Sequence, residues 1–408
     1  MKILQINCVY PVGSTGRIAE DIHRAAQAAG HTSLICYGRG DAPTAAEVYK
    51  TCPEWYAKAN NLWSRISGMP YGGCYFSTNK LISILKKEQP DVVHLHCING
   101  FFVNIYRLVA WLRDHRIKTV LTLHAEFMYT ANCAHAYECE KWTTGCGNCP
   151  RRREATNAYF FDRTAGSFEK MRRAFADFRE LTVVSVSPFV AERAVRSPIM
   201  AGLAHCTILN GIDTAAFSPR ENANLRRELQ IPQNHRVLLH VTAEFTRAQG
   251  HIKGGYYVAE VARRLARDGV TVLVAGSYLP GERDGEGLRL LGSIPQKERL
   301  AELYSLADAT LLASKRETFS MPVAESLCCG TPVVGFEAGA PERIALPAHS
   351  RFVPYGDTDA LVAAAKDMIN TPQDAHACRE QALAHYDATR MAGAYLDLYG
   401  EMYERTFR

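Results

Sequence analysis

The sequence contains no apolar run that approaches the length of a transmembrane helix. Its opening segment, MKILQINCVY, has a single lysine before a strand-like stretch, unlike a secretory signal peptide. The formal net charge of +5 is too small to call for nucleic acid as a partner, although it permits attraction to phosphate or anionic lipid. We therefore expect a cytoplasmic protein that binds no nucleic acid.

The composition, 47% hydrophobic and 22% charged, is that of an ordinary globular protein, and 408 residues are enough for two hydrophobic cores. Strand-like and helical segments alternate along the chain, which indicates parallel, doubly wound sheets. The pattern restarts at residue 236 with VLLHVT. The predicted fold class is therefore α/β, with two Rossmann-like domains. The strand-like segments include residues 2–9, 32–37, 91–96, 118–123, 181–187, 270–276 and 309–313.

Residues 313–336, ASKRETFSMPVAESLCCGTPVVGF, read as the end of a buried strand, a loop, a helix and a second strand. Glu317 in the loop and Glu325 in the helix can both face the crevice beyond the carboxyl end of the strand. The start of the helix offers backbone N–H groups and a positive dipole end to a diphosphate. The residues that carry these groups are Thr318, Phe319, Ser320 and Met321. This arrangement can hold a nucleotide-sugar.

The E-x7-E spacing and the following CCGTPVVGF resemble the donor-site signature of the retaining glycosyltransferases of family 4, which have the GT-B fold. Residues 210–219, NGIDTAAFSP, resemble the linker segment of the same family. The resemblance extends from the first strand to the last helix. It implies two domains with an interdomain cleft: residues 1–212 on the acceptor side and residues 213–388 for the nucleotide-sugar donor. Residues 389–408 would form a helix that crosses back to the first domain.

The resemblance also assigns basic and glycine residues to the donor. Lys253 matches the position of a diphosphate-binding lysine, but the usual companion arginine in a Gly-Arg dipeptide is missing. Arg247 either substitutes for it or is a solvated surface residue. Gly13 and Gly16 follow the first strand without the GxGxxG spacing of a dinucleotide site, so an ordinary turn is the alternative. In the family this loop lies near the donor phosphates and the acceptor.

His124 ends the strand VLTLH and can bond a sugar hydroxyl or stabilise a developing charge; a purely structural histidine is the alternative. The family commonly has a His-Asp pair here, whereas this chain has His124-Ala125-Glu126, and Glu126 either replaces the aspartate or does not. By resemblance, Glu325 holds the ribose hydroxyls and Glu317 the donor sugar or reacting region. Lys253 would neutralise the leaving phosphate.

A cysteine-rich excursion spans residues 125–160, and its C-x2-C pair is followed by proline. Because disulfides are rare in the cytoplasm, a structural zinc site is the leading interpretation, with buried thiols or an iron–sulfur cluster as alternatives. The expected ligands are Cys133, Cys139, Cys146 and Cys149. This excursion resembles a subgroup of the family associated with colanic-acid, capsule or O-antigen assembly.

Two further segments are either packed or in contact with lipid, and we expect packing for both. Residues 55–76 carry six aromatic side chains. Residues 168–179 place an apolar stripe beside basic residues, as a core helix or an interfacial helix would. The stripe consists of Phe168, Met171, Phe175 and Phe178.

The function expected from the resemblance is retaining transfer of a sugar from a nucleotide-diphosphate-sugar donor to a glycan acceptor, without a catalytic metal. We expect a lipid-linked acceptor, a role in bacterial surface polysaccharide (capsule, O-antigen or exopolysaccharide) biosynthesis, and peripheral association with the inner face of the cell membrane. A GT-B sugar-nucleotide epimerase is one alternative. A catalytically weak subunit that binds nucleotide-sugar as a scaffold is the other.

Overall fold

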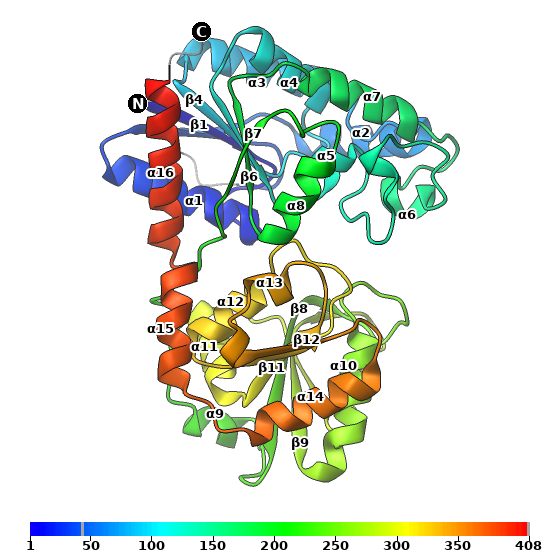
Figure 1. Ribbon diagram of the computed structural model, residues 1–408, viewed down its shortest axis with the longest axis vertical. Helices are drawn as coiled ribbons and strands as arrows, with labels where there is room; N and C mark the ends of the chain where they lie inside the picture. Colours follow the sequence, from blue (N-terminus) through cyan, green and yellow to red (C-terminus); the bar gives the residue numbers. More distant parts are fainter. Residues whose placement is uncertain (42–44, 406–408) are drawn as a thin grey trace. The chain divides into compact units, whose positions relative to one another are not determined.

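The computed structural model describes residues 1–41 and 45–405. The chain divides into two compact units (Figure 1): residues 1–209 with the chain from Thr389 onward, and Asn210–Ala388. The sequence predicted boundaries after residues 212 and 388. Each unit is built on a parallel sheet with helices on both faces, so the predicted α/β class with two doubly wound domains is confirmed.

The first unit holds a seven-stranded parallel sheet in the order β3-β2-β1-β4-β5-β6-β7. Its central strands are buried on both faces, and for this reason they read as continuous apolar runs in the sequence. The strands are β1 (Lys2–Asn7), β2 (Thr32–Tyr37), β3 (Val48–Lys50), β4 (Val92–Leu95), β5 (Thr119–Leu123), β6 (Leu181–Ser185) and β7 (Ala204–Thr207).

The helices of this unit lie on both sides of the sheet. α1 and α16 bury Ile22 and Tyr399 on one face, against Ile3, Val92 and Val120 of the strands. The last helix therefore packs on the first unit, although it follows the second unit in sequence. The helices are α1 (Gly13–Ala28), α2 (Glu54–Ser67), α3 (Tyr75–Glu88), α4 (Ile105–Asp114), α5 (Phe127–Thr130), η1 (Lys141–Thr143), α6 (Arg152–Thr156), α7 (Thr164–Phe175), α8 (Pro188–Arg196) and α16 (Ala388–Glu404).

The second unit has a six-stranded parallel sheet in the order β10-β9-β8-β11-β12-β13. The strands are β8 (Arg236–Phe245), β9 (Val270–Tyr278), β10 (Leu288–Gly292), β11 (Ala309–Leu312), β12 (Val333–Phe336) and β13 (Ser350–Val353). The helices are α9 (Ala223–Glu228), α10 (Gly255–Leu265), η2 (Ala266–Asp268), α11 (Lys297–Leu306), α12 (Met321–Cys328), α13 (Pro341–Ile344), η3 (Pro347–His349), α14 (Thr358–Asn370) and α15 (Ala375–Tyr386).

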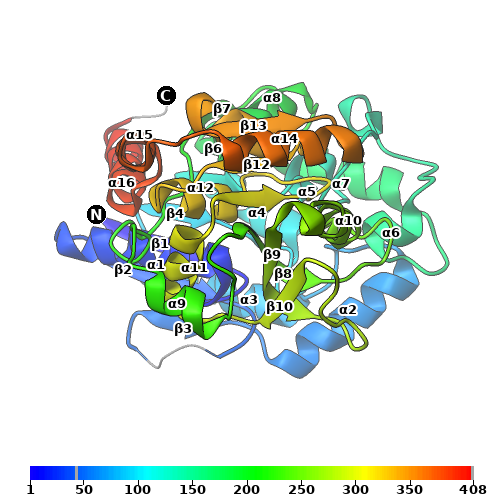
Figure 2. The ribbon, with the colours of Figure 1, turned by 90° about the horizontal axis from the view of Figure 1, so that it is seen from below.

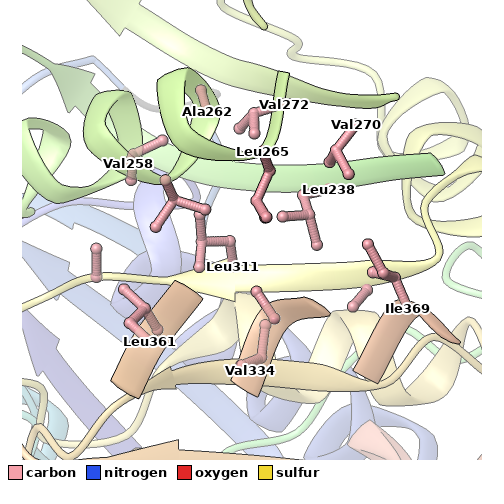
Figure 3. Close-up of a cluster of buried hydrophobic side chains, with 14 of the residues drawn as sticks. Leu238, Val258, Ala262, Leu265, Val270, Val272, Leu311, Val334, Leu361 and Ile369 are labelled. Carbon is pink, nitrogen blue, oxygen red and sulfur yellow. The ribbon is translucent and has the colours of Figure 1, made fainter. Parts of the chain in front are cut away.

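α10 and α14 cover one face of this sheet, and α11 and α12 lie on the other (Figure 2). Between the strands and α10 and α14 lies an apolar core in which Leu238, Leu265, Leu311 and Leu361 meet (Figure 3). This core fixes the strands whose carboxyl ends carry the residues of the next section. No helix in the described parts of the chain combines the length and apolarity needed to cross a membrane.

Candidate active site

The loop before α10 approaches the end of β11 closely. Gly254 has φ +69°, and a Cβ at this position would lie 2.0 Å from the carbonyl oxygen of Ala313. Any other residue would clash with that backbone, so glycine is required for the approach. As a consequence, Lys253 is held beside the loop that carries Glu317.

Backbone hydrogen bonds join three loops at the carboxyl edge of the second sheet. The N–H of Lys315 donates to the carbonyl of Ile252 at 2.8 Å, and the N–H of Glu317 donates to the carbonyl of Ala338 at 2.9 Å. These residues follow β8, β11 and β12, which are neighbouring strands. The position of Glu317 is therefore set by its backbone on this edge, where open α/β sheets bind ligands.

Lys253 and Glu317 form an ion pair at this edge. The distance from Lys253 Nζ to Glu317 Oε1 is 2.7 Å, and 32% of the lysine side chain and 19% of the glutamate side chain remain exposed. Both groups can thus reach a ligand from solvent. An anionic ligand would compete with Glu317 for the ammonium group.

Glu325 lies in α12 and is oriented by a residue that the sequence did not predict. The buried Tyr304, from α11, donates its hydroxyl to Glu325 Oε2 at 2.9 Å. Burial, together with this carboxylate, raises the pKa of Tyr304 well above its usual value, so the phenol stays protonated and keeps donating. The carboxylate therefore has a defined orientation before any ligand binds.

The backbone at the start of α12 is strained. Ser320 has φ +95°, a region that residues other than glycine rarely adopt, and its buried Oγ has no hydrogen-bond partner in the described structure. Thr318 and Phe319 are also buried, with the Phe319 ring packed 6.3 Å from that of Tyr386, whereas Met321 is partly exposed. Such strain is typical of functional sites, where surrounding contacts hold an unusual conformation.

Arg247 is bound to a different loop. Its guanidinium lies 2.7 Å from Glu282 Oε2 and donates to the carbonyl of Arg283, and its N–H donates to Glu282 Oε1. Among the described side chains it makes no bond with Lys253 or Glu317. In this structure Arg247 anchors the loop that contains Glu282 and Arg283. The predicted role at the diphosphate would require its guanidinium to leave Glu282.

In the first unit, Gly13 and Gly16 lie where α1 follows β1. Gly13 has φ +70°, which favours glycine, and a Cβ on Gly16 would lie 3.2 Å from the carbonyl oxygen of Val9. Both glycines therefore allow α1 to begin close to the end of β1. They bring backbone to the carboxyl edge of this sheet, and their proposed contact with the donor phosphates stays a prediction.

His124 directly follows β5 at the same edge. Its Nε2 lies 3.2 Å from Nδ1 of His96, which directly follows β4. Dense surrounding protein lowers the pKa of His124 to about 4, so the imidazole is neutral at pH 7. The expectation that His124 bonds a hydroxyl is compatible with this neutral state.

Glu126, which follows His124 in place of the usual aspartate, is held by contacts within the first unit. It is fully buried, its Oε1 lies 3.2 Å from Nε of Arg193 in α8, and its Oε2 accepts the N–H of Ala136. A buried carboxylate needs such partners, because desolvation would otherwise disfavour its charge. Through these contacts Glu126 anchors the cysteine-rich excursion to α8.

Two models of known protein families match the sequence of this chain. The family model described as Glycosyltransferase Family 4 matches residues 15–216, and the model described as Glycosyl transferases group 1 matches residues 237–371. The chain is a GT-B glycosyltransferase. The predicted family is thereby confirmed.

Relatives and solved structures agree with this assignment. The glycosyltransferase is 24% identical to the "Putative colanic acid biosynthesis glycosyl transferase WcaC" of Escherichia coli K12, over 98% of its own length and 99% of that protein. Its fold is similar to sucrose-phosphate synthase from Thermosynechococcus elongatus, with a TM-score of 0.71, 18% identity, and 98% and 99% of the two chains covered. Anabaena HepE in complex with UDP-glucose matches with a TM-score of 0.65 and 16% identity, over 98% and 100%.

The cysteines of the excursion are near one another without forming a preformed metal site. Burial, with a smaller contribution from Cys139 and Cys149 nearby, raises the pKa of Cys133 to about 11 and that of Cys146 to about 12. Yet within residues 1–41 and 45–405, no three His, Cys, Asp or Glu side chains are arranged as metal ligands. The zinc site stays a prediction, and ligation would require these side chains to rearrange.

The glycosyltransferase has an exposed aromatic surface where packing was expected. The relative exposure of Trp55 is 71%, that of Trp63 56%, and that of Phe76 77%. A second segment is tied to α2, because the N–H of Tyr159 donates to the carbonyl of Arg65 at 2.7 Å. We define the aromatic surface as Trp55, Leu62, Trp63, Ile66, Tyr75, Phe76, Tyr159, Phe160 and Phe161, all exposed.

The predicted packing of residues 55–76 is therefore wrong for four of its six aromatic residues, although Tyr71 is buried and Tyr56 is partly buried. α2 and the start of α3 carry the exposed rings on the surface of the first unit. By contrast, the predicted core stripe is confirmed: Phe168, Met171, Phe175 and Phe178 are all buried.

Proposed function

We propose that the glycosyltransferase binds a nucleotide-diphosphate sugar at the carboxyl edge of its second sheet. One observation carries this proposal: the Lys253–Glu317 ion pair, which backbone hydrogen bonds between three loops hold beside the start of α12. Lys253 binds the diphosphate, together with backbone N–H groups at Thr318 to Met321. Glu325, oriented by Tyr304, accepts hydrogen bonds from the ribose hydroxyls. The similarity in fold to HepE, whose structure holds UDP-glucose, supports this class of donor.

The proposed reaction transfers the sugar to a glycan acceptor with retention of configuration and without a catalytic metal. Resemblance to retaining enzymes supports the stereochemistry. Departure of the nucleoside diphosphate is the costly event, because negative charge develops on its phosphate as the bond to the sugar breaks. Lys253 and the positive end of α12 offer compensating positive charge at that place. Glu317 then faces the sugar. We assign His124, at the carboxyl edge of the first sheet, to hydrogen bonding with a substrate hydroxyl.

We further propose that the acceptor is a lipid-linked glycan of surface-polysaccharide assembly. The name of the Escherichia coli relative, which refers to colanic acid, supports the pathway class. The aromatic surface supports attachment to a membrane, because exposed Lys58 and Arg163 lie in the same segments and Arg163 is 5.8 Å from the ring of Phe161. Aromatic and basic groups together favour the interface of anionic lipid.

The test is a panel of nucleotide sugars, first in thermal-shift and then in turnover assays. A donor that binds the folded protein raises its melting temperature. Transfer to a lipid-linked acceptor, with retained configuration and in the presence of a chelator, would support the full proposal. Conversion of the donor without any acceptor would favour the epimerase, and binding without turnover on any acceptor would favour the scaffold.

A further inference from the structure

A cavity of about 310 Å³ lies at the amino edge of the first sheet, between the ends of α3 and α4. Pro90 and Ile117, which shortly precede β4 and β5, form part of its wall. Because His124 follows β5 at the carboxyl edge, the cavity lies at the opposite edge of the sheet from this residue. The function described above gives the cavity no role.

One wall of the cavity is a fixed pair of aromatic rings. The ring centroids of Trp111 and His115 are 4.2 Å apart with an interplanar angle of 28°, and Nδ1 of His115 lies 2.9 Å from the carbonyl oxygen of Trp111. A carbonyl oxygen can only accept, so Nδ1 donates and holds the imidazole against the indole. Leu85, Pro90 and Ile117 add aliphatic surface. A ligand with an apolar face can pack against these walls.

The polar groups of the cavity make no bonds to the protein around them. In the part of the chain that the structure describes, the ammonium group of Lys86, the side-chain amide of Gln89 and Nε2 of His115 have neither a hydrogen-bond partner nor an ion-pair partner. Lys86 and Gln89 are also exposed. None of the described residues that line the cavity is an aspartate or a glutamate. The lining therefore favours a ligand that is negatively charged and forms several hydrogen bonds.

The size of the cavity restricts the ligand further. Small-molecule sites have volumes of about 300–1,000 Å³, so this cavity is at the lower limit and suits one sugar ring better than a whole nucleotide-sugar. A pyranose has an apolar C–H face and a rim of hydroxyl groups, which match the apolar walls and the free groups of Gln89 and His115. A carboxylate on the sugar would pair with Lys86.

We propose that this cavity is a second saccharide site, which binds an acidic sugar residue such as a uronate. The assignment of this sugar to the glycan acceptor or product rests on the proposed function. The site would hold the glycan on the first unit independently of the donor, because the proposed donor residues all belong to the second sheet.

Two neighbouring lysines of α3 provide a matched pair of variants. Lys87 does not line the cavity, and its ammonium group lies 3.2 Å from Glu88. Lys86→Gln and Lys87→Gln therefore remove the same charge one residue apart, and only the first removes it from the cavity. Both lysines are exposed, so both variants should fold.

The experiment follows the indole N–H signal of Trp111 by NMR in the full chain. The chain has four tryptophans, and the spectrum of Trp111→Phe identifies the signal. Methyl glucuronide should shift this signal with a millimolar dissociation constant, and methyl glucoside, which lacks the carboxylate, should bind more weakly. Lys86→Gln should weaken binding of the glucuronide about fivefold, whereas Lys87→Gln should leave it unchanged.

Three results would overturn the proposal: no shift of the Trp111 signal with the glucuronide, equal affinities for the glucuronide and the glucoside, or equal losses in the two lysine variants. Tighter binding of uridine monophosphate would assign the cavity to a nucleotide instead. The readout needs no donor. Glucuronide binding in a protein that binds no nucleotide-sugar would support this site and refute the proposed function, and sugar transfer without glucuronide binding would refute this site alone.

Discussion

The two glutamates of the second sheet should affect different kinetic constants when each is replaced by glutamine. Glu317 pairs with Lys253 at 2.7 Å, so Glu317→Gln removes one charge and leaves the lysine available to the diphosphate. Donor affinity should change little, by about threefold or less, because the lost contact and the released ammonium offset each other. A charged hydrogen bond is worth about 2 kcal/mol, so loss of one made in the transition state should lower kcat about 30-fold.

Glu325→Gln should show the opposite effect. Tyr304 still donates to the side-chain oxygen of the glutamine. The side-chain NH2 group, which replaces the other carboxylate oxygen, can only donate, so the glutamine cannot accept hydrogen bonds from both ribose hydroxyls. This contact exists equally in the ground and transition states, so the donor dissociation constant should rise about 30-fold while kcat stays near that of the wild type.

Calorimetric donor binding and saturating initial rates for both variants test this assignment. Glu302→Gln is the control, because Glu302 forms a surface ion pair with Arg299 elsewhere on α11. The ion pair of Lys253 and Glu317 is partly exposed, so Glu317→Gln should cost at most about 1 kcal/mol of stability and remain folded. If both constants were unchanged in both folded variants, the donor site would be wrongly assigned.

The remaining predictions concern strain, membrane contact, metal and pH. Ser320→Gly should be more stable than Ser320→Ala by about 1 kcal/mol in urea unfolding, because both lack the hydroxyl and only glycine relieves the φ of +95°; equal stabilities would argue against strain. Replacing Trp63 and Phe160 by serine should weaken binding to anionic vesicles about tenfold, whereas the control Tyr278→Ser should leave it unchanged. Salt should weaken vesicle binding by the wild type. No binding of the wild type at any salt concentration would refute membrane contact. Purified protein should contain near-stoichiometric zinc, and chelation should destabilise the first unit before it affects donor affinity; a metal-free protein of full stability would exclude zinc. Burial lowers the pKa of His240 to about 4, below an unfolded value of about 6.5. Between these two values unfolding takes up a proton, so the free energy of unfolding decreases as the pH is lowered from about 6.5 toward 4. At pH 5 this loss is about 2 kcal/mol, and His240→Gln should flatten that part of the stability curve; an unchanged slope would contradict it.

The sequence predicted the sheets and the edge on which the proposed donor-binding residues lie, because both depend on the local order of strands, loops and helices. A buried parallel strand is a short apolar run, and a loop between such a strand and a helix must fall at the carboxyl edge. Glu317 was therefore placed correctly without knowledge of its partner. Tyr304, in contrast, belongs to the preceding helix α11, and no spacing in the sequence relates it to Glu325.

The sequence could not predict the exposure of the aromatic side chains of α2 or the ion-pair partner of Arg247, because both depend on tertiary contacts. The periodicity of α2 shows that one face is apolar, but only tertiary contacts decide whether another element covers that face, and Trp55 and Trp63 stay exposed. Arg247 was considered because it lies in the loop after β8, where it could substitute for the arginine of the missing Gly-Arg dipeptide. Its actual partner, Glu282, follows β9, and this pairing depends on how two loops fold at the sheet edge.

The carboxyl edges of the two sheets differ in the charge that they present. At the second sheet, Lys253 and the start of α12 present positive charge, which suits a diphosphate. At the first sheet, desolvation lowers the pKa of His96 and of His124, so both imidazoles are neutral at pH 7. A neutral imidazole attracts an anion less than an ammonium group does, which agrees with the proposed assignment of the diphosphate to Lys253.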